Sequence, residues 1–147
     1  HRYFLTMCAF QRRRHFTSAD LVNDAWFAFT RTADRQRFAL IAYCFMPDHL
    51  HVLAEGLTPY SDLRAFMSIA KQRSAHAARR WIRGPLWQSG YFERVLREEE
   101  DLRDVAKYVV QNPVRAGLVR SPTDYRFLGS DILPTNDFVE STAWRPT

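Results

Sequence analysis

The sequence is short of cysteine, of lysine and of long apolar runs, and each shortage excludes a class of protein. Its two cysteines, Cys8 and Cys44, are too few for a disulfide scaffold and are not at the spacing of a structural zinc site. No stretch reaches the roughly 18 apolar residues that a membrane-spanning helix needs. Repeats, low-complexity tracts and a visible signal peptide are also missing. We therefore expect a cytoplasmic protein with no membrane partner.

The scarcity of lysine stands out because the chain is nevertheless basic. Among 21 basic residues the only lysines are Lys71 and Lys107, and the net charge is +5. A basic surface attracts phosphate groups, and arginine adds planar, paired hydrogen bonds to phosphates and to guanine edges. Genome base composition can also favour arginine over lysine, but it does not explain the net charge. The charge therefore favours a nucleic acid as partner.

Length and composition suit one globular domain, since the chain has 147 residues, of which 46% are hydrophobic and 25% charged. Aromatic and β-branched runs predict strands at residues 2–10, 38–46, 49–56 and 91–98. Apolar residues at helical spacing predict helices at about 20–33 and 61–81, and one from about 101 that ends or bends at Asn112–Pro113. Residues 121–147 are polar and turn-rich, and we expect a loosely packed tail.

The order of these elements predicts the fold. Pro47 and Asp48 form a tight turn, so the strands on either side of them pair antiparallel. The first six elements follow a βαββαβ pattern, which predicts an α+β, ferredoxin-like fold with a mainly antiparallel sheet and helices on one face. A further helix follows. We assign residues 1–120 to one domain and 121–147 to a C-terminal tail of that same domain.

Two histidines stand one residue apart in the strand predicted at 49–56. Alternate residues of a strand point to the same face, so His49 and His51 project side by side, with Cα atoms about 7 Å apart. Two neighbouring imidazoles can hold one divalent ion and leave its other coordination positions open. The same spacing also fits two half-exposed histidines on an edge strand.

A second pair of polar residues lies on the last predicted helix. Tyr108 and Asn112 are four positions apart, so both side chains lie on one helical face. The amide oxygen of Asn112 is a ligand that suits a hard metal ion. Alone, this pair also fits a surface tyrosine followed by a helix-ending Asn-Pro.

Together these segments resemble a known family. "MPDHLHVL" resembles the His-hydrophobic-His (HUH) motif of the single-tyrosine transposases. "YVVQNPVRAGLV" is similar to the catalytic-tyrosine helix of their branch that is associated with repetitive extragenic palindromes (REP). "LWQSGYFERVL" is similar to the segment that this branch places between the two motifs. The resemblance covers roughly residues 2–120, with the motifs in the family's order.

The resemblance implies a metal-dependent HUH endonuclease that cuts and rejoins single-stranded DNA at REP-like hairpins. Tyr108 would be the nucleophile and would become joined to the 5′ phosphate. His49, His51 and Asn112 would hold Mg²⁺ or Mn²⁺, with Gln111 as the rival third ligand. For this branch we favour a monomer and leave a dimer open.

Arginines are the candidates for contacts to the DNA. Arg12, Arg13 and Arg14 follow the first strand, and Arg73 and Arg80 lie on one stripe of the second helix. Each of them also fits a solvated basic face. Two other functions stay open, namely a nuclease that uses activated water and a domesticated DNA-binding module that no longer cuts. A covalent protein–DNA adduct would exclude the first, and any cleavage would exclude the second.

Overall fold

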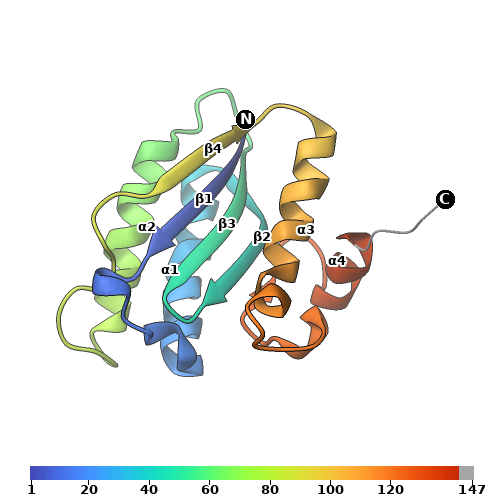
Figure 1. The fold of residues 1–147 in the computed structure, drawn as a ribbon. Coiled ribbons are helices and arrows are strands. Elements are labelled where there is room, and N and C mark those ends of the chain that lie inside the picture. Colours follow the sequence, from blue (N-terminus) through green and yellow to red (C-terminus); the bar gives the residue numbers. More distant parts are fainter. Residues whose placement is uncertain (143–147) are drawn as a thin grey trace.

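A five-stranded antiparallel sheet forms the centre of the molecule (Figure 1). The computed structural model describes residues 1–142, without the side chains of Glu99 and Glu100. Its strands are β1 (Arg2–Cys8), β2 (Phe38–Met46), β3 (His49–Gly56), β4 (Phe92–Leu96) and β5 (Leu128–Gly129), in the order β4-β1-β3-β2-β5. Because β3 is inserted between β1 and β2, and β1 between β3 and β4, the predicted ferredoxin-like arrangement is confirmed.

Helices cover both faces of the sheet (Figure 1). They are α1 (Ala19–Gln36), α2 (Leu63–Ala78), α3 (Glu99–Arg115) and α4 (Thr135–Thr142). The two helices of the βαββαβ unit, α1 and α2, pack on one face as predicted, and α3 and α4 pack on the other. None of the helices within residues 1–142 is both long and apolar enough to span a membrane.

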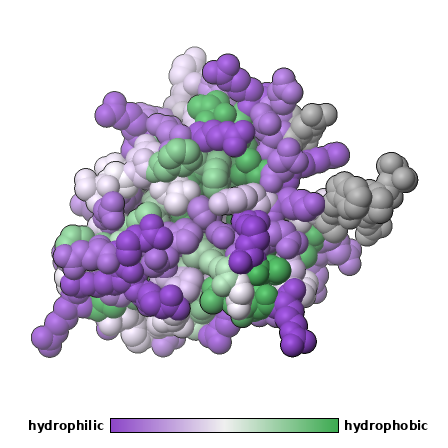
Figure 2. All heavy atoms as spheres, viewed as in Figure 1, coloured by the Kyte–Doolittle hydropathy of each residue, from purple (hydrophilic) through white to green (hydrophobic). Residues whose placement is uncertain are grey.

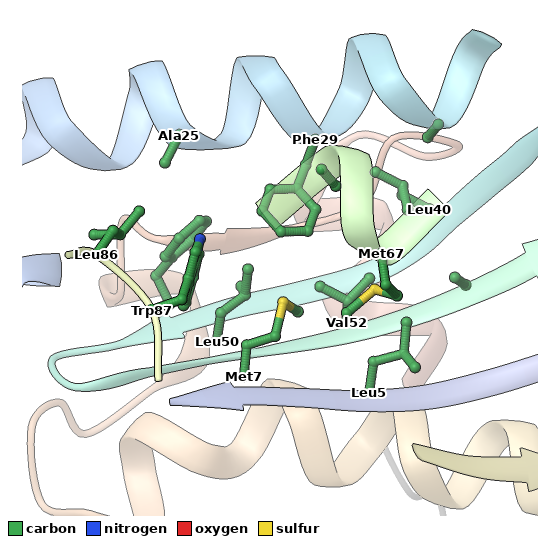
Figure 3. Close-up of a cluster of buried hydrophobic side chains, with 14 of the residues drawn as sticks. Leu5, Met7, Ala25, Phe29, Leu40, Leu50, Val52, Met67, Leu86 and Trp87 are labelled. Atoms are coloured by element: carbon green, nitrogen blue, oxygen red, sulfur yellow. The ribbon is translucent and has the colours of Figure 1, made fainter. Parts of the chain in front are cut away.

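Side-chain alternation along β3 decides which residues face which helices. Leu50, Val52 and Ala54 belong to the apolar cluster under α1 and α2. In Figure 3, Leu50 and Val52 point from the sheet toward Phe29 and Met67 of these helices. Because successive residues of a strand point to opposite faces, the odd-numbered positions of β3 face α3. Both histidines therefore lie on the α3 side of the sheet.

The sequence predicted that this helix ends or bends at Asn112–Pro113, and α3 does not end there. It continues through Pro113 to Arg115. Proline has no N–H, so the carbonyl of Val109 lacks its usual helical partner, but the fixed φ of proline is compatible with a helix. The last turn is completed by hydrogen bonds from Ala116 N to Asn112 O (3.0 Å) and from Leu118 N to the carbonyl of the proline (2.9 Å).

The prediction of a loosely packed tail was wrong for residues 121–142. Strand β5 pairs with β2, and the Tyr125 hydroxyl donates a hydrogen bond to the Phe45 carbonyl oxygen (2.5 Å). Phe138 of α4 is only 3% exposed and belongs to the apolar cluster under α3. A few well-spaced apolar side chains suffice to dock a segment of polar composition. Residues 143–147 lie outside the described part of the chain, and the division at residue 120 stays a prediction.

We expect Phe138→Ala to lower the free energy of unfolding by about 3 kcal/mol, because it leaves a cavity in a buried apolar cluster. Ile132→Ala, in the same segment but 54% exposed in the parent, should cost less than about 1 kcal/mol. Urea unfolding of the two variants measures the difference. Equally small losses would mean that α4 does not contribute to the packed structure.

Candidate catalytic and metal-binding site

The two histidines form the floor of the site beneath α3. Their ring centroids are 4.7 Å apart. His51 is nearly buried, at 7% exposed, and is flanked by Thr6 of β1 and Cys44 of β2 in the sheet register. His49 lies at the start of β3, next to the tight turn, and is more open to solvent.

Each histidine ring is held through the same nitrogen. Nδ1 of His51 lies 2.8 Å from the hydroxyl oxygen of Thr6, and Nδ1 of His49 lies 2.7 Å from Oδ1 of Asp48. With Nδ1 engaged, Nε2 of each ring is the nitrogen left to bind a ligand. Histidines that bind metals are commonly oriented in this way through their second nitrogen.

Electrostatics keep His51 in the form that binds metals. Burial lowers the pKa of His51 to about 3, and the positive charges of His49 and Arg115 add to the effect. The ring is therefore neutral at physiological pH. Metal ions bind neutral imidazole, so no proton has to be displaced from His51 before it can act as a ligand.

Tyr108 of α3 lies beside His51. Its ring centroid is 6.0 Å from that of His51 and 6.0 Å from that of Phe4, and the rings of Phe4 and His51 are 5.3 Å apart. The Tyr108 side chain is 47% exposed. Packing against Phe4 thus holds the ring next to His51 while solvent can still reach it.

Asn112, one helical turn beyond Tyr108, carries a buried amide nitrogen with no hydrogen-bond partner among the described residues. An unpaired buried amide group is costly. Rotating the amide by half a turn exchanges its nitrogen and oxygen, so a metal ion here would meet an oxygen ligand. Gln111 has no such orphaned atom among those described.

The side chains of His49, His51 and Asn112 carry donor atoms of the kinds that bind a divalent metal ion. Within residues 1–142 no group of three or more histidine, cysteine, aspartate or glutamate side chains could hold one. A third protein ligand beside the two histidines would therefore come from an amide. The donor set would then be two Nε2 atoms and one oxygen, which would suit manganese better than magnesium.

Arg115 is part of the site and was missed by sequence reasoning. Its guanidinium carbon lies 4.1 Å from the Tyr108 ring centroid, and its Nη2 donates a hydrogen bond to the Tyr108 carbonyl oxygen at 2.7 Å. The sequence did contain a signal for this contact, because Tyr108 and Arg115 are seven residues apart, which is about two turns of a helix. The prediction that the helix ends or bends at Asn112–Pro113 left the position of Arg115 relative to Tyr108 undetermined.

The arginines that follow β1 differ in their contacts. Nε of Arg12 lies 3.0 Å from Oδ2 of Asp48, so its guanidinium is paired within the protein. Arg13 donates to the side-chain oxygen of Gln11 at 3.1 Å, and Arg14 is exposed. Hydrophilic side chains gather over this end of the molecule, where the segment after β1 and the end of α2 lie (Figure 2).

The predicted basic stripe of α2 is divided in the structure. Arg73 lines a groove of about 1120 Å³ between the end of α2 and residues 82–86, together with Arg79 and Arg83. Arg80 does not line this groove. Its Nη1 lies 3.7 Å from a carboxylate oxygen of Asp24 on α1, and its guanidinium stacks over Trp81.

We expect the stability of the metal-free protein to fall as the pH drops from about 6.5 toward 3, because the unfolded chain protonates His51 and the folded chain does not. Below the unfolded pKa the unfolded state binds more protons, so stability rises with pH across this window. His51→Gln should remove this part of the pH dependence. Urea unfolding at several pH values, with a chelator present, measures it, and identical slopes for parent and variant would contradict the burial of a neutral His51.

Known proteins are similar in sequence to the part of the chain that carries this site. A family model described as "Transposase IS200 like" matches residues 1–112. A Haemophilus influenzae protein provisionally named a REP-associated tyrosine transposase is 24% identical over 138 residues, which cover 85% of this chain and 77% of the relative. The REP-associated tyrosine transposase of Escherichia coli is 29% identical over 93 residues, which cover 61% of this chain and 53% of that protein.

Solved structures share the fold. A REP-associated tyrosine transposase bound to a REP hairpin superposes with a TM-score of 0.74 at 22% identity, covering 86% of this chain and 74% of the other. A provisionally named transposase of Deinococcus radiodurans has a TM-score of 0.58 at 20% identity, covering 74% and 88%. The resemblance inferred from the motifs is confirmed. Because the family model spans the four-stranded core of the sheet, both histidines and α3 as far as Asn112, the chain belongs to the IS200-like transposase family.

Proposed function

We propose that this chain is a metal-dependent transposase that cleaves and rejoins single-stranded DNA at REP-like hairpins through a covalent bond to Tyr108. The observation that carries the proposal is the half-exposed Tyr108 ring, 6.0 Å from a histidine whose Nε2 is left available for a metal ion. The likeness to a hairpin-bound transposase supports a DNA hairpin as the partner.

In the proposed reaction the phenolic oxygen of Tyr108 attacks the scissile phosphorus. A bond forms between this oxygen and phosphorus, and the bond from phosphorus to the 3′ oxygen breaks. The phenol loses its proton to solvent, and the departing 3′ oxygen gains one and becomes a hydroxyl. The DNA is left joined to the protein as a 5′ phosphotyrosine. Because one phosphodiester replaces another, a 3′ hydroxyl can reverse the step and rejoin strands.

Three residues would hold the divalent ion, namely His49 and His51 through Nε2 and Asn112 through its amide oxygen. When bound, Mg²⁺ or Mn²⁺ supplies positive charge that polarises the scissile phosphate. Arg115 would add a fixed guanidinium beside the nucleophile, which can donate paired hydrogen bonds to phosphate oxygens. Its stacking on the Tyr108 ring also restricts the movement of that ring.

The basic groove at the end of α2 is our candidate for the DNA path. The loop that forms one wall of the groove is hydrogen-bonded to the segment after β1, from Phe10 N to Leu86 O at 2.9 Å. Arg13 and Arg14 therefore lie on the segment that connects the groove to the turn before His49. We propose that hairpin phosphates contact Arg73 and its neighbours in the groove, while an unpaired strand passes Arg13 and Arg14.

A single chain supplies all the proposed catalytic groups. Tyr108 lies against His51 of its own chain, so a second subunit is not needed to bring the tyrosine to the proposed metal site. This supports a monomer that acts in cis. The placement of Tyr108 also favours covalent attack over a water-based nuclease, in which that side chain would have no chemical role.

We expect Tyr108→Phe to bind hairpin DNA and Mn²⁺ nearly as well as the parent but to form no covalent adduct and to release no cleaved strand. The substitution keeps the packing of the ring against Phe4 and His51 and removes only the nucleophilic oxygen. Incubation with single-stranded hairpin oligonucleotides and Mn²⁺, followed by denaturing electrophoresis and peptide mapping, measures both outcomes.

Tyr60→Phe is the matched control, because Tyr60 is 92% exposed and lies outside the site. It should cleave like the parent. An adduct mapped to another tyrosine would show that Tyr108 is not the nucleophile. Strong cutting by Tyr108→Phe would favour the water-based nuclease, and no cutting by the parent would favour the non-cutting DNA-binding module.

We expect His49→Ala and His51→Ala each to reduce Mn²⁺ affinity by at least about tenfold and to abolish cleavage, since each removes one proposed ligand. Isothermal titration with Mn²⁺ in the absence of DNA measures the first effect separately from activity. His76→Ala, which changes an exposed histidine of α2, should leave Mn²⁺ affinity unchanged. Parental Mn²⁺ affinity in both site variants would locate the metal elsewhere.

A further inference from the structure

We propose that Arg12 and Asp48 are positioning residues that hold His49 in the orientation and tautomer needed to bind the metal, and that Arg12 is not a DNA contact. This inference rests on the proposed metal site. Arg12 Nε lies 3.0 Å from one carboxylate oxygen of Asp48, and the other oxygen lies 2.7 Å from Nδ1 of His49. The three side chains form one continuous hydrogen-bonded chain.

The backbone holds Arg12 over the turn that carries Asp48. Ala9 N donates to the Asp48 carbonyl oxygen at 2.9 Å, and Phe16 N donates to the carbonyl oxygen of the preceding proline at 3.0 Å. Between these two anchors Gln11 and Arg12 adopt left-handed φ values of 54° and 55°. Such values are uncommon for residues other than glycine and concentrate where function depends on the conformation.

Both oxygens of Asp48 are used in this arrangement. One carboxylate oxygen contacts Arg12 and the other contacts His49, at 3.0 and 2.7 Å. A carboxylate oxygen at this distance favours the tautomer of His49 that carries its proton on Nδ1, which leaves Nε2 to bind a metal ion. Arg12 fixes the plane of the carboxylate, because its guanidinium also lies 3.3 Å from Cys8 Sγ and has two anchoring contacts.

The neighbouring Arg13 provides a matched comparison. It is the next residue in the chain and carries the same charge, but its hydrogen bond goes to Gln11 and not to Asp48. Loss of a positive charge near a cation site should by itself strengthen cation binding. A weaker Mn²⁺ affinity after removing Arg12 would therefore have to come from lost positioning.

The experiment compares Arg12→Gln, Asp48→Ala, the double variant and Arg13→Gln, each checked for parental thermal unfolding. Titration with Mn²⁺ alone should show a loss of roughly 10- to 100-fold for Asp48→Ala and a smaller loss for Arg12→Gln. The double variant should be no weaker than Asp48→Ala, because Arg12 acts through Asp48. Arg13→Gln should bind Mn²⁺ at least as tightly as the parent.

Two further measurements do not depend on activity. Nitrogen NMR of the metal-free protein should find the Nδ1–H tautomer of His49 in the parent and a shift toward Nε2–H in Asp48→Ala. The salt dependence of hairpin binding should weaken by about one counterion for Arg13→Gln and stay unchanged for Arg12→Gln. Arg12→Lys, which keeps the charge, should recover only part of the Mn²⁺ affinity.

The opposite pattern would overturn the inference. A reduced salt slope for Arg12→Gln, with parental Mn²⁺ affinity, would make Arg12 a phosphate contact. If the parent binds no Mn²⁺, the proposed metal site is wrong, and the NMR result alone then decides whether Asp48 sets the His49 tautomer. An unchanged tautomer in Asp48→Ala would rule out the positioning role.

Discussion

The site depends on the burial of β3 from both faces. This strand lies between β1 and β2, with α1 and α2 over one face and α3 over the other. In such a position every side chain has to be apolar or have its polar atoms hydrogen-bonded. His51 meets this condition at Nδ1 through Thr6, and its burial keeps the ring neutral. Strand alternation then leaves both histidines facing the same helix.

Helix α3 supplies the proposed catalytic groups that lie on the histidine side of the sheet. Residues at intervals of three, four and seven share a face of a helix, so Tyr108, Asn112 and Arg115 are brought above the same part of the sheet. The buried side of α3, which includes Val109 and Val110, holds this face in position. The geometry of the candidate site and the core packing are thus consequences of one amphipathic helix docked on one sheet.

The end of the sheet near His49 connects the site to the basic surface. The segment after β1 is hydrogen-bonded both to the β2–β3 turn and to the loop that lines the groove at the end of α2. Adjacent arginines on this segment have different partners: Arg12 points to Asp48 and Arg13 to Gln11. Their separate partners are consistent with the left-handed backbone at Gln11 and Arg12, which turns neighbouring side chains in different directions.

The local pattern of apolar residues and turn residues was sufficient to predict several features of the structure. The bounds of β2 and β3, the common face of His49 and His51, and the antiparallel βαββαβ order all follow from periodicity and turn residues. These depend on interactions between residues close in sequence, and for that reason the sequence predicts them. The motifs around His49 and Tyr108 likewise pointed to the IS200-like family that the comparisons show.

Contacts between segments that are distant in sequence decided the features that the local pattern did not predict. Whether Pro113 ends α3 depends on the packing of that helix and on hydrogen bonds formed beyond the proline, and the position of Arg115 over Tyr108 follows from its continuation. The partner of Arg12 lies 36 residues away in sequence, so no local pattern could distinguish it from Arg13. The docking of residues 121–142 likewise depends on the β2 edge and the surface of α3. The sequence alone determined which residue types could form the site, whereas long-range packing determined which of them meet, because such contacts join segments whose separation along the chain carries no periodic signal.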